Sequence, residues 1–508
     1  MLGKLRSRTG ALIDSVGIGQ QPYQQDETVG FADLDETGMD YPTLQGGADT
    51  GEGGYQMSSG GGGEGMGNSL TTGADGVPVP MDEGAPCFPK EDEPGIEMDG
   101  KNQIGPWQAG WNVTNAIQGM FIVSLPFVVL HGGWWGFAAL IGVAWICYYT
   151  GILLVECLYD EEGRRIRRSY VEIAVACWGP YLGGRLVHAA QLTELLMTDI
   201  LYVVLCGDLL EGSFPTAGMD RLGWMIFSTI CLLPCAFLTN LRAVSRLSFY
   251  NTVSHIAINA IVFMYCLTCM GSWHWSAIRW TIDIHMFPTV LGIVVFSYTS
   301  QIFLPTLEGN MVDRSKFRPM LKWSHVAAAA FKSIFGLVGF LTFGPFTQEE
   351  VTNNLPTQYF RSIVNVILVF KALLSYPLPY YAALELLEAS FFLGRPKTPF
   401  PTCFLGDGAL KEWILALRVC LVLFTLFMAV SIPYFALLMG LIGSCTGCML
   451  SFLWPCIFHL HLKRHAIPKL RVYLDYLIIG IGVFFGVIGI IYSSAALSKA
   501  MNAIPDQY

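Results

Sequence analysis

One stretch in the middle of the chain decides the fold. Residues 296–305 place five consecutive polar-capable side chains inside an apolar run and end it with a proline. They read Phe296-Ser297-Tyr298-Thr299-Ser300-Gln301-Ile302-Phe303-Leu304-Pro305. Within a membrane-spanning helix, such residues are costly unless they face an aqueous cavity or a ligand. The stretch therefore predicts a helix that is broken at membrane depth.

A second stretch has the same character and lies about five apolar runs earlier. It reads Gln118-Gly119-Met120-Phe121-Ile122-Val123-Ser124-Leu125-Pro126, and His131-Gly132-Gly133 follows. Glycine and proline both weaken a helix there. For either stretch alone, a proline kink filled by neighbouring helices is the better explanation. Two interrupted helices at corresponding positions are typical of transporters built from inverted repeats, and favour a substrate site between them.

The first 105 residues have a different composition from the rest. They hold five basic and 18 acidic residues, a formal charge of −13, whereas the remaining chain carries +4. This segment has too little apolar surface to offset the entropy of ordering it. We expect a disordered acidic cytosolic tail over 1–105 and a transmembrane transporter domain over 106–500. The motif Tyr41-Pro42-Thr43-Leu44 fits a Tyr-x-x-apolar sorting signal, so sorting adaptors are expected to bind the tail.

The rest of the chain repeats apolar runs of about 20 residues, each long enough to cross a bilayer. We expect an all-α polytopic membrane protein in contact with lipid. Its density of apolar runs excludes a soluble enzyme, and we expect no enzymatic activity, cofactor, metal or nucleic-acid partner. Eleven spans are expected, at 111–130, 136–157, 186–206, 223–239, 247–270, 288–308, 324–343, 362–386, 413–432, 434–460 and 472–496.

Loop charge predicts the orientation of these spans. With the tail in the cytosol, the cytosolic loops hold 18 basic residues and the opposite loops hold four. Basic residues resist translocation, so this asymmetry favours a cytosolic N-terminus and an odd number of spans. The C-terminus is then expected in a lumen or outside the cell.

Three ionisable residues inside the spans are candidates for proton coupling. Glu194 is the most central acid, and Lys332 and Lys371 lie in the seventh and eighth spans. Charged groups in a bilayer usually pair, change protonation or line a pathway. The lysines are expected either to pair with Glu194 or to hold a substrate carboxylate. A static ion pair that only fixes helix register is the alternative for each.

Several segments also resemble a known family. They are Trp111 to Leu130, Gly292 to Pro305, Leu307 to Met311, Lys371 to Pro379, Leu232 to Leu238 and Phe435 to Leu441. Together they resemble the amino acid/auxin permease family, and within it the vesicular members that carry inhibitory amino acids. The resemblance covers nearly all of residues 105–495. The tail shares only its acidic character with that family.

The resemblance implies a leucine-transporter-type fold, with two inverted five-helix repeats plus one extra helix. It implies GABA and glycine as substrates and the synaptic vesicle membrane of presynaptic terminals as the location. It also implies proton/amino acid antiport, driven by the gradient of a separate vesicular proton pump. Whether protons or chloride accompany the substrate stays open at this point. Alternatives are a proton- or sodium-coupled neutral amino acid symporter at the lysosome or plasma membrane, and an amino acid sensor.

The expected substrate site lies between the first and sixth spans. We expect the substrate carboxylate to meet free N–H groups at Gly119, Met120 and Phe121, because the amides that begin a half-helix lack partners. The expected polar shell consists of Thr114, Gln118, Ser297, Tyr298, Thr299 and Gln301. The substrate ammonium is expected to meet backbone carbonyls or Glu194.

Overall fold

The computed structural model describes residues 105–237, 241–391, 412–464 and 467–502. The expectations for the tail, including its Tyr41 motif, lie outside these residues. Six helical stretches of the described chain are long and apolar enough to cross a membrane: Phe121–Glu156, Arg314–Phe346, Gln358–Glu388, Glu412–Ser431, Phe435–Leu462 and Lys469–Asn502. Apart from an isolated bridge between Tyr159 and Arg165, the described part contains no β-structure. The predicted all-α membrane fold is confirmed.

The first half of the domain begins with a divided helix. Its elements are α2 (Pro106–Gln118), η2 (Met120–Ser124), α3 (Leu125–Glu156), α4 (Tyr170–Gly179), η3 (Pro180–Gly184), α5 (Arg185–Ser213), α6 (Arg221–Leu232), η4 (Leu233–Phe237) and α7 (Leu241–Thr268). Within α3, two helices join at Gly133, whose φ of 53° and ψ of −141° are not helical. A side chain there would also collide with the Arg279 carbonyl, so glycine is required. The kink separates the first two expected spans.

The second half begins with another divided helix. Its main elements are α8 (Phe287–Tyr298), α9 (Leu304–Gly309), α10 (Phe317–Phe343), α11 (Gln358–Ser375), α12 (Pro377–Phe391), α13 (Glu412–Ser431), α14 (Phe435–Ile442), α15 (Trp454–Leu462) and α16 (Lys469–Asn502). Two π-helical segments, η10 (Gly443–Gly447) and η11 (Met449–Leu453), connect α14 to α15. As expected, α13 and α14 are separated at Pro433.

One helix was not expected. Residues 158–185 were expected to form a loop between two spans, but α4 and η3 lie there. The Ser169 hydroxyl accepts a hydrogen bond from the Glu172 amide at 3.2 Å, and the Glu172 carboxylate accepts one from the Arg168 amide at 2.6 Å. This resembles the reciprocal capping that starts many helices. The Ser-x-x-Glu pattern of residues 169–172 is therefore the sequence signal for the start of α4.

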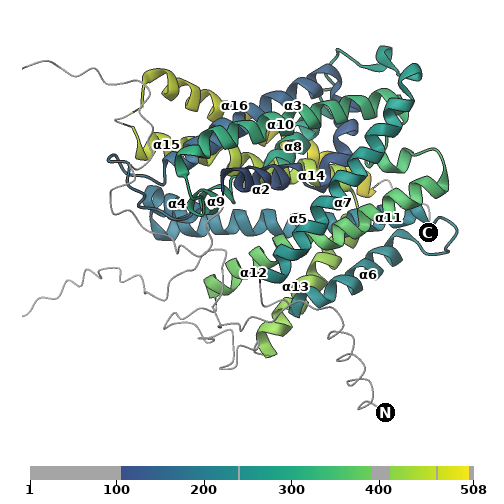
Figure 1. The fold of residues 1–508 in the computed structure, drawn as a ribbon, viewed down its shortest axis with the longest axis horizontal. Helices are drawn as coiled ribbons and strands as arrows, with labels where there is room; N and C mark the ends of the chain where they lie inside the picture. The colour runs from purple at the N-terminus through teal and green to yellow at the C-terminus, as the bar shows by residue number, and fades with distance from the viewer. Residues whose placement is uncertain (1–104, 238–240, 392–411, 465–466, 503–508) are drawn as a thin grey trace, which may run out of the picture.

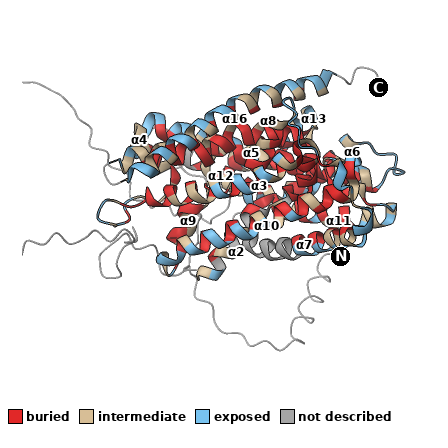
Figure 2. Ribbon diagram, turned by 90° about the horizontal axis from the view of Figure 1, so that it is seen from above, coloured by how far each residue is buried: buried red, intermediate tan, exposed pale blue. Residues whose placement is uncertain are grey.

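The divided helices lie in the centre of the bundle. α8 packs against α3, α14 and α16, and α10 packs against α2 and α3. Figure 2 shows buried residues concentrated in this centre, while α16 runs along the edge with exposed residues. Side chains at Gly292 or Gly443 would meet the backbone of the other helix, so these glycines let α8 and the α14–η10 segment touch. In Figure 1, α4, α9 and α15 lie toward one end of the bundle and α6 toward the other.

Candidate functional site

Both predicted helix breaks are present. α2 ends at Gln118, and Gly119, with φ 13° and ψ −177°, turns the chain into the 3-10 helix η2. α8 ends at Tyr298, where Thr299 is extended with φ −63° and ψ 116°, and α9 starts only at Leu304. Each break leaves backbone N–H and C=O groups without partners inside the helix. The prediction that the first and sixth spans are broken is confirmed.

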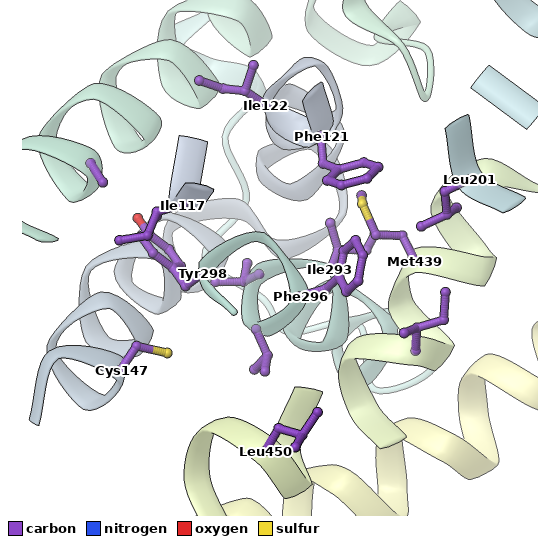
Figure 3. Packing of buried hydrophobic residues seen from close by; sticks show 14 of the residues in the cluster. Ile117, Phe121, Ile122, Cys147, Leu201, Ile293, Phe296, Tyr298, Met439 and Leu450 are labelled. Atoms are coloured by element: carbon purple, nitrogen blue, oxygen red, sulfur yellow. The ribbon is translucent and has the colours of Figure 1, made fainter. Parts of the chain in front are cut away.

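An aromatic cluster joins the two breaks. The ring centroid of Phe121, just after the first break, lies 5.0 Å from that of Phe296, just before the second. Tyr202 of α5 stacks on Phe121 at 5.6 Å, and Phe435 of α14 lies at 6.1 Å. Figure 3 shows Phe121 beside Phe296 in this packing. The aromatic cluster of Phe121, Tyr202, Phe296 and Phe435 therefore closes the space between four segments.

Lys332 of α10 is held at the second break. Its side chain is 1% exposed, and its ammonium donates a hydrogen bond to the main-chain carbonyl of Ser297. The same nitrogen lies 4.0 Å from the centroid of the Tyr298 ring. The last carbonyls of a helix attract a cation, and a ring face adds a cation–π interaction. Lys332 therefore places its charge on the end of α8.

The hydroxyl groups of the second break differ in what they bind. Ser297 Oγ donates to the Val294 carbonyl at 2.8 Å and Thr299 Oγ1 to the Val295 carbonyl at 3.2 Å, so both are used within α8. The Tyr298 hydroxyl is buried and makes no hydrogen bond within the described part of the chain. Among these three side chains, Tyr298 is thus the one with a donor to offer to a ligand.

Gln301 was expected in the polar shell of the substrate site, but its side-chain amide is bonded to protein groups. Its Oε1 accepts from the Ser300 amide at 3.0 Å and from Ser451 Oγ at 2.8 Å. Its Nε2 donates to the Cys147 carbonyl and to Thr150 Oγ1, both at 3.4 Å. Both ends of the amide are therefore occupied by protein groups. Gln301 ties the second break to α3 and η11 instead of presenting a free amide to a substrate.

The first break carries the remaining expected site residues. Thr114 and Gly119 are half-buried, and Phe121 is buried in the aromatic cluster. Gln118 ends α2 and Met120 begins η2, but their side chains lie outside the described set. The structure therefore places the backbone of Gly119, Met120 and Phe121 at the break, as expected.

Glu194 is buried but lacks the expected partners. It is 5% exposed, its Oε2 makes no hydrogen bond within the described chain, and it lies beside Thr446 of η10. Within the described residues, neither Lys332 nor Lys371 forms an ion pair with it. The expected pairing is therefore absent from the described structure, and Lys332 instead binds the Ser297 carbonyl at the end of α8.

Comparisons with known proteins identify the family. Residues 102–499 match the family described as "Transmembrane amino acid transporter protein". The chain belongs to this transporter family. It is 53% identical over 400 residues to the vesicular GABA transporter of Caenorhabditis elegans, covering 79% of this chain and 81% of that protein. It is 50% identical over 407 residues to the human vesicular inhibitory amino acid transporter, covering 79% and 77%.

A solved structure supports the fold. The transporter chain resembles a Na⁺-coupled sialic acid symporter, solved in a substrate-bound outward-open state, with a TM-score of 0.51. The two share 14% sequence identity, and the match covers 80% of this chain and 91% of that one. At this identity the likeness concerns the fold alone. It supports the expected leucine-transporter-type architecture of this amino acid transporter.

A buried ion cluster lies beyond the second break. Glu308 of α9 is fully buried, accepts a hydrogen bond from the Tyr159 hydroxyl and pairs with Arg165 Nε at 3.3 Å. Arg165 also donates through Nη2 to the Pro305 carbonyl at 2.9 Å. Arg314 Nε lies 3.9 Å from Glu308. The Glu308 cluster therefore fastens the short helix α9 to the segment after α3.

Proposed function

We propose that this chain loads GABA and glycine into the synaptic vesicles of presynaptic terminals by exchanging them for protons. The observation that carries the proposal is the meeting of two helix breaks, with Lys332 on the end of α8 and the Tyr298 hydroxyl left without a partner. The names of the similar transporters supply the substrate class and the vesicular location. The gradient is made by a separate vesicular proton pump.

The proposed topology has eleven membrane crossings. The N-terminal tail and the Glu308 cluster lie on the cytosolic side, and the C-terminus lies in the lumen. This orientation is supported by the excess of basic residues in the loops placed in the cytosol. It also puts the aromatic cluster on the luminal side of the two breaks, because α8 enters from the luminal loops.

The proposed substrate site uses both breaks. The substrate carboxylate meets amides at Gly119, Met120 and Phe121, where η2 begins, because these N–H groups have no helical acceptors. The Tyr298 hydroxyl supplies a further hydrogen bond. The main-chain carbonyls at the end of α8 can accept hydrogen bonds from the substrate ammonium. Lys332 already binds the Ser297 carbonyl, so fewer of these carbonyls are left for the ammonium. A zwitterion with separated charges fits this arrangement.

Alternating access requires two closures that open in turn, and the proposal assigns them to two groups of contacts. On the luminal side, the aromatic cluster brings Phe121, Phe296 and Phe435 together. On the cytosolic side, Glu308 and Arg165 hold α9 in place. Opening one side while the other stays closed exposes the breaks to one compartment at a time. In the proposed cycle, the form with both groups of contacts in place is the occluded form of the carrier.

Glu194 is the proposed proton carrier. A buried carboxyl without a counter-charge is stable when it is protonated, and a change of access lets it release the proton. Each elementary charge moved across the membrane is worth about 2.3 kcal/mol per 100 mV. A lumen-positive potential therefore drives uptake if net positive charge leaves the lumen.

The test uses the purified full-length protein in proteoliposomes with an acidic lumen. Labelled GABA and glycine should accumulate, and dissipating the proton gradient should abolish accumulation. Reversing the gradient and adding external sodium separates antiport from the alternative symport. Accumulation that requires external protons or sodium would favour the symporter and overturn the proposed direction of coupling.

A further inference from the structure

The end of the bundle opposite the Glu308 cluster carries a second group of buried charges. Asp208 near the end of α5 forms an ion pair with Arg221 at the start of α6. Glu349 and Glu350 follow α10 in the connection to η9 (Val351–Asn354). Asp208 and Glu349 are close enough to Glu350 to interact with it electrostatically. Three carboxylates thus gather around one guanidinium.

Two of the three carboxylates have a compensating partner. Asp208 has Arg221. Glu349 Oε2 accepts a hydrogen bond from the Ala436 amide at 2.9 Å, so this carboxylate caps the positive end of α14. Glu350 is 5% exposed, and its Oε1 makes no hydrogen bond within the described part of the chain. Glu350 therefore adds a third negative charge to a group whose one guanidinium, that of Arg221, already pairs with Asp208.

The other charged groups in reach do not supply the missing partner. α5 adds only Glu211, a further negative charge, one turn beyond Asp208. Asp220 uses its carboxylate to cap α6 through the Gly223 amide at 3.0 Å. On α11, Arg361 donates to the Asn353 carbonyl at 3.1 Å and to the Gln358 side chain at 2.6 Å.

The remaining neighbours carry no other charge. His274 binds the Leu341 carbonyl through Nδ1 at 3.2 Å and lies against Gly344. The sequences of η2, η9 and α14 contain no titratable side chain. Burial in this setting, with the nearby carboxylates of Asp208 and Glu349, raises the pKa of Glu350 well above its usual range.

Glu350 also directly precedes η9, which packs against other segments at the luminal end of the bundle. The next residues, Val351 and Thr352, are fully buried, and η9 packs against η2 and α11. Glu349 meanwhile holds the first turn of α14, whose Phe435 belongs to the aromatic cluster. Opening this end must move η9 and the start of α14 away from η2. The environment of Glu350 would then change from protein to water.

We propose that Glu350 is a luminal proton-binding site, and that the luminal end of the transporter is stable in its closed form only while Glu350 holds a proton. Loss of the proton leaves a third carboxylate beside Asp208 and Glu349, with only Arg221 to offset the three charges, and their repulsion favours opening. Luminal acidity thus closes this end after the amino acid has left, and favours return of the empty carrier to the cytosolic side. The inference deepens the proposed function and rests on it for the luminal orientation.

The sign of the pH effect follows from linkage. The pKa of Glu350 is higher in the closed form than in water, so protons favour the closed form. This preference is complete below the ordinary glutamate pKa and is lost as the pH rises through the raised value. Each unit of difference between the two pKa values changes the ratio of closed to open forms about tenfold.

The test is hydrogen–deuterium exchange of the full-length protein in lipid nanodiscs at pH 5.5 and pH 7.5, corrected for intrinsic exchange rates. Segment 347–355 and the first turn of α14 should exchange about tenfold more slowly at the lower pH. Glu350→Gln, which is permanently neutral, should be protected equally at both values. Glu211→Gln, an exposed matched control on the same luminal end, should keep the wild-type response.

A second variant, Asp208→Asn, tests the inference independently in case Glu350→Gln does not fold. Asp208→Asn removes a like charge and frees Arg221, so the transition should move to lower pH. Equal wild-type protection at both pH values, or an unchanged pH response in both Glu350→Gln and Asp208→Asn, would overturn the inference. Because exchange needs no substrate, this result is independent of whether the protein transports GABA.

Discussion

The ammonium of Lys332 on α10 binds the main-chain carbonyl of Ser297 at the end of α8. The bond joins the seventh expected span to the break in the sixth, and Lys332 also lies against the Tyr298 ring. A positive charge on the carbonyl end of a half-helix stabilises a break that would otherwise leave polar groups unpaired. Lys332 therefore both stabilises the break in α8 and adds a positive charge to the site.

Replacing Lys332 should destabilise the protein. Lys332→Met keeps the length of the side chain but leaves the Ser297 carbonyl without this donor, at an expected cost of about 1–3 kcal/mol. Thermal unfolding in detergent measures the change. Lys322→Met is the matched control, because Lys322 is exposed on the same helix and should tolerate the change. Equal melting temperatures for both variants would argue against an anchoring role.

Replacing Glu194 should abolish proton-driven accumulation of GABA but leave GABA–GABA exchange intact. Glu194→Gln holds no exchangeable carboxyl proton, so gradient-driven accumulation of GABA should fall to background, while exchange of GABA across equal pH should persist. The packing should survive, since Glu194 Oε2 has no hydrogen bond to lose in the described chain. Normal gradient-driven accumulation by Glu194→Gln would remove it from the coupling mechanism.

The Glu308–Arg165 pair should show strong coupling between its members. Removing one member of a buried ion pair typically costs about 3–5 kcal/mol, because the other charge is left unpaired. Glu308→Gln should therefore destabilise the protein, and Arg165→Met in the same chain should recover part of the loss. A double-mutant cycle on thermal stability measures this coupling.

The control for that cycle is an exposed pair in the same segment. Arg164 and Glu162 form an ion pair at the surface, and Glu162→Gln should leave stability almost unchanged. If Glu308→Gln lowered thermal stability no more than Glu162→Gln, the Glu308 cluster would not be holding α9 in place.

Opening the aromatic cluster should make the carrier leaky toward the lumen. Phe121→Ala removes ring contacts to Tyr202, Phe296 and Phe435, each worth about 0.5–1.5 kcal/mol beyond simple burial. Vesicles preloaded with labelled GABA should then release it several-fold faster than wild type. Phe370→Ala serves as the control, because Phe370 is exposed on the outer face of α11. Equal release rates would show that the cluster is no barrier.

The sequence predicted the broken helices because their causes are local. Gly119 and the polar run ending at Pro305 interrupt helices by their own chemistry, and the structure has both breaks. The capping of α4 by Ser169 is equally local, because Ser169 and Glu172 are three residues apart in the sequence.

The partners of the charged residues were not predictable, because they depend on how distant segments pack. Lys332 is bound to Ser297 instead of Glu194, and Arg165, counted only as a loop charge, is buried against Glu308. Gln301 was expected to face a ligand, but Ser451, 150 positions away, occupies it. Hydropathy and spacing locate such residues near the site but do not specify which atom each one meets.

The most direct test of the account is GABA uptake by Tyr298→Phe in proteoliposomes with an acidic lumen. This variant removes only a hydroxyl that has no hydrogen bond in the described structure, so folding should be unaffected. We predict that wild type accumulates GABA and that the KM of the variant rises about three- to tenfold, the value of one hydrogen bond. Tyr359→Ala, at an exposed position, should match wild type. No accumulation by wild type, or an unchanged KM in Tyr298→Phe, would contradict a substrate site at the two helix breaks.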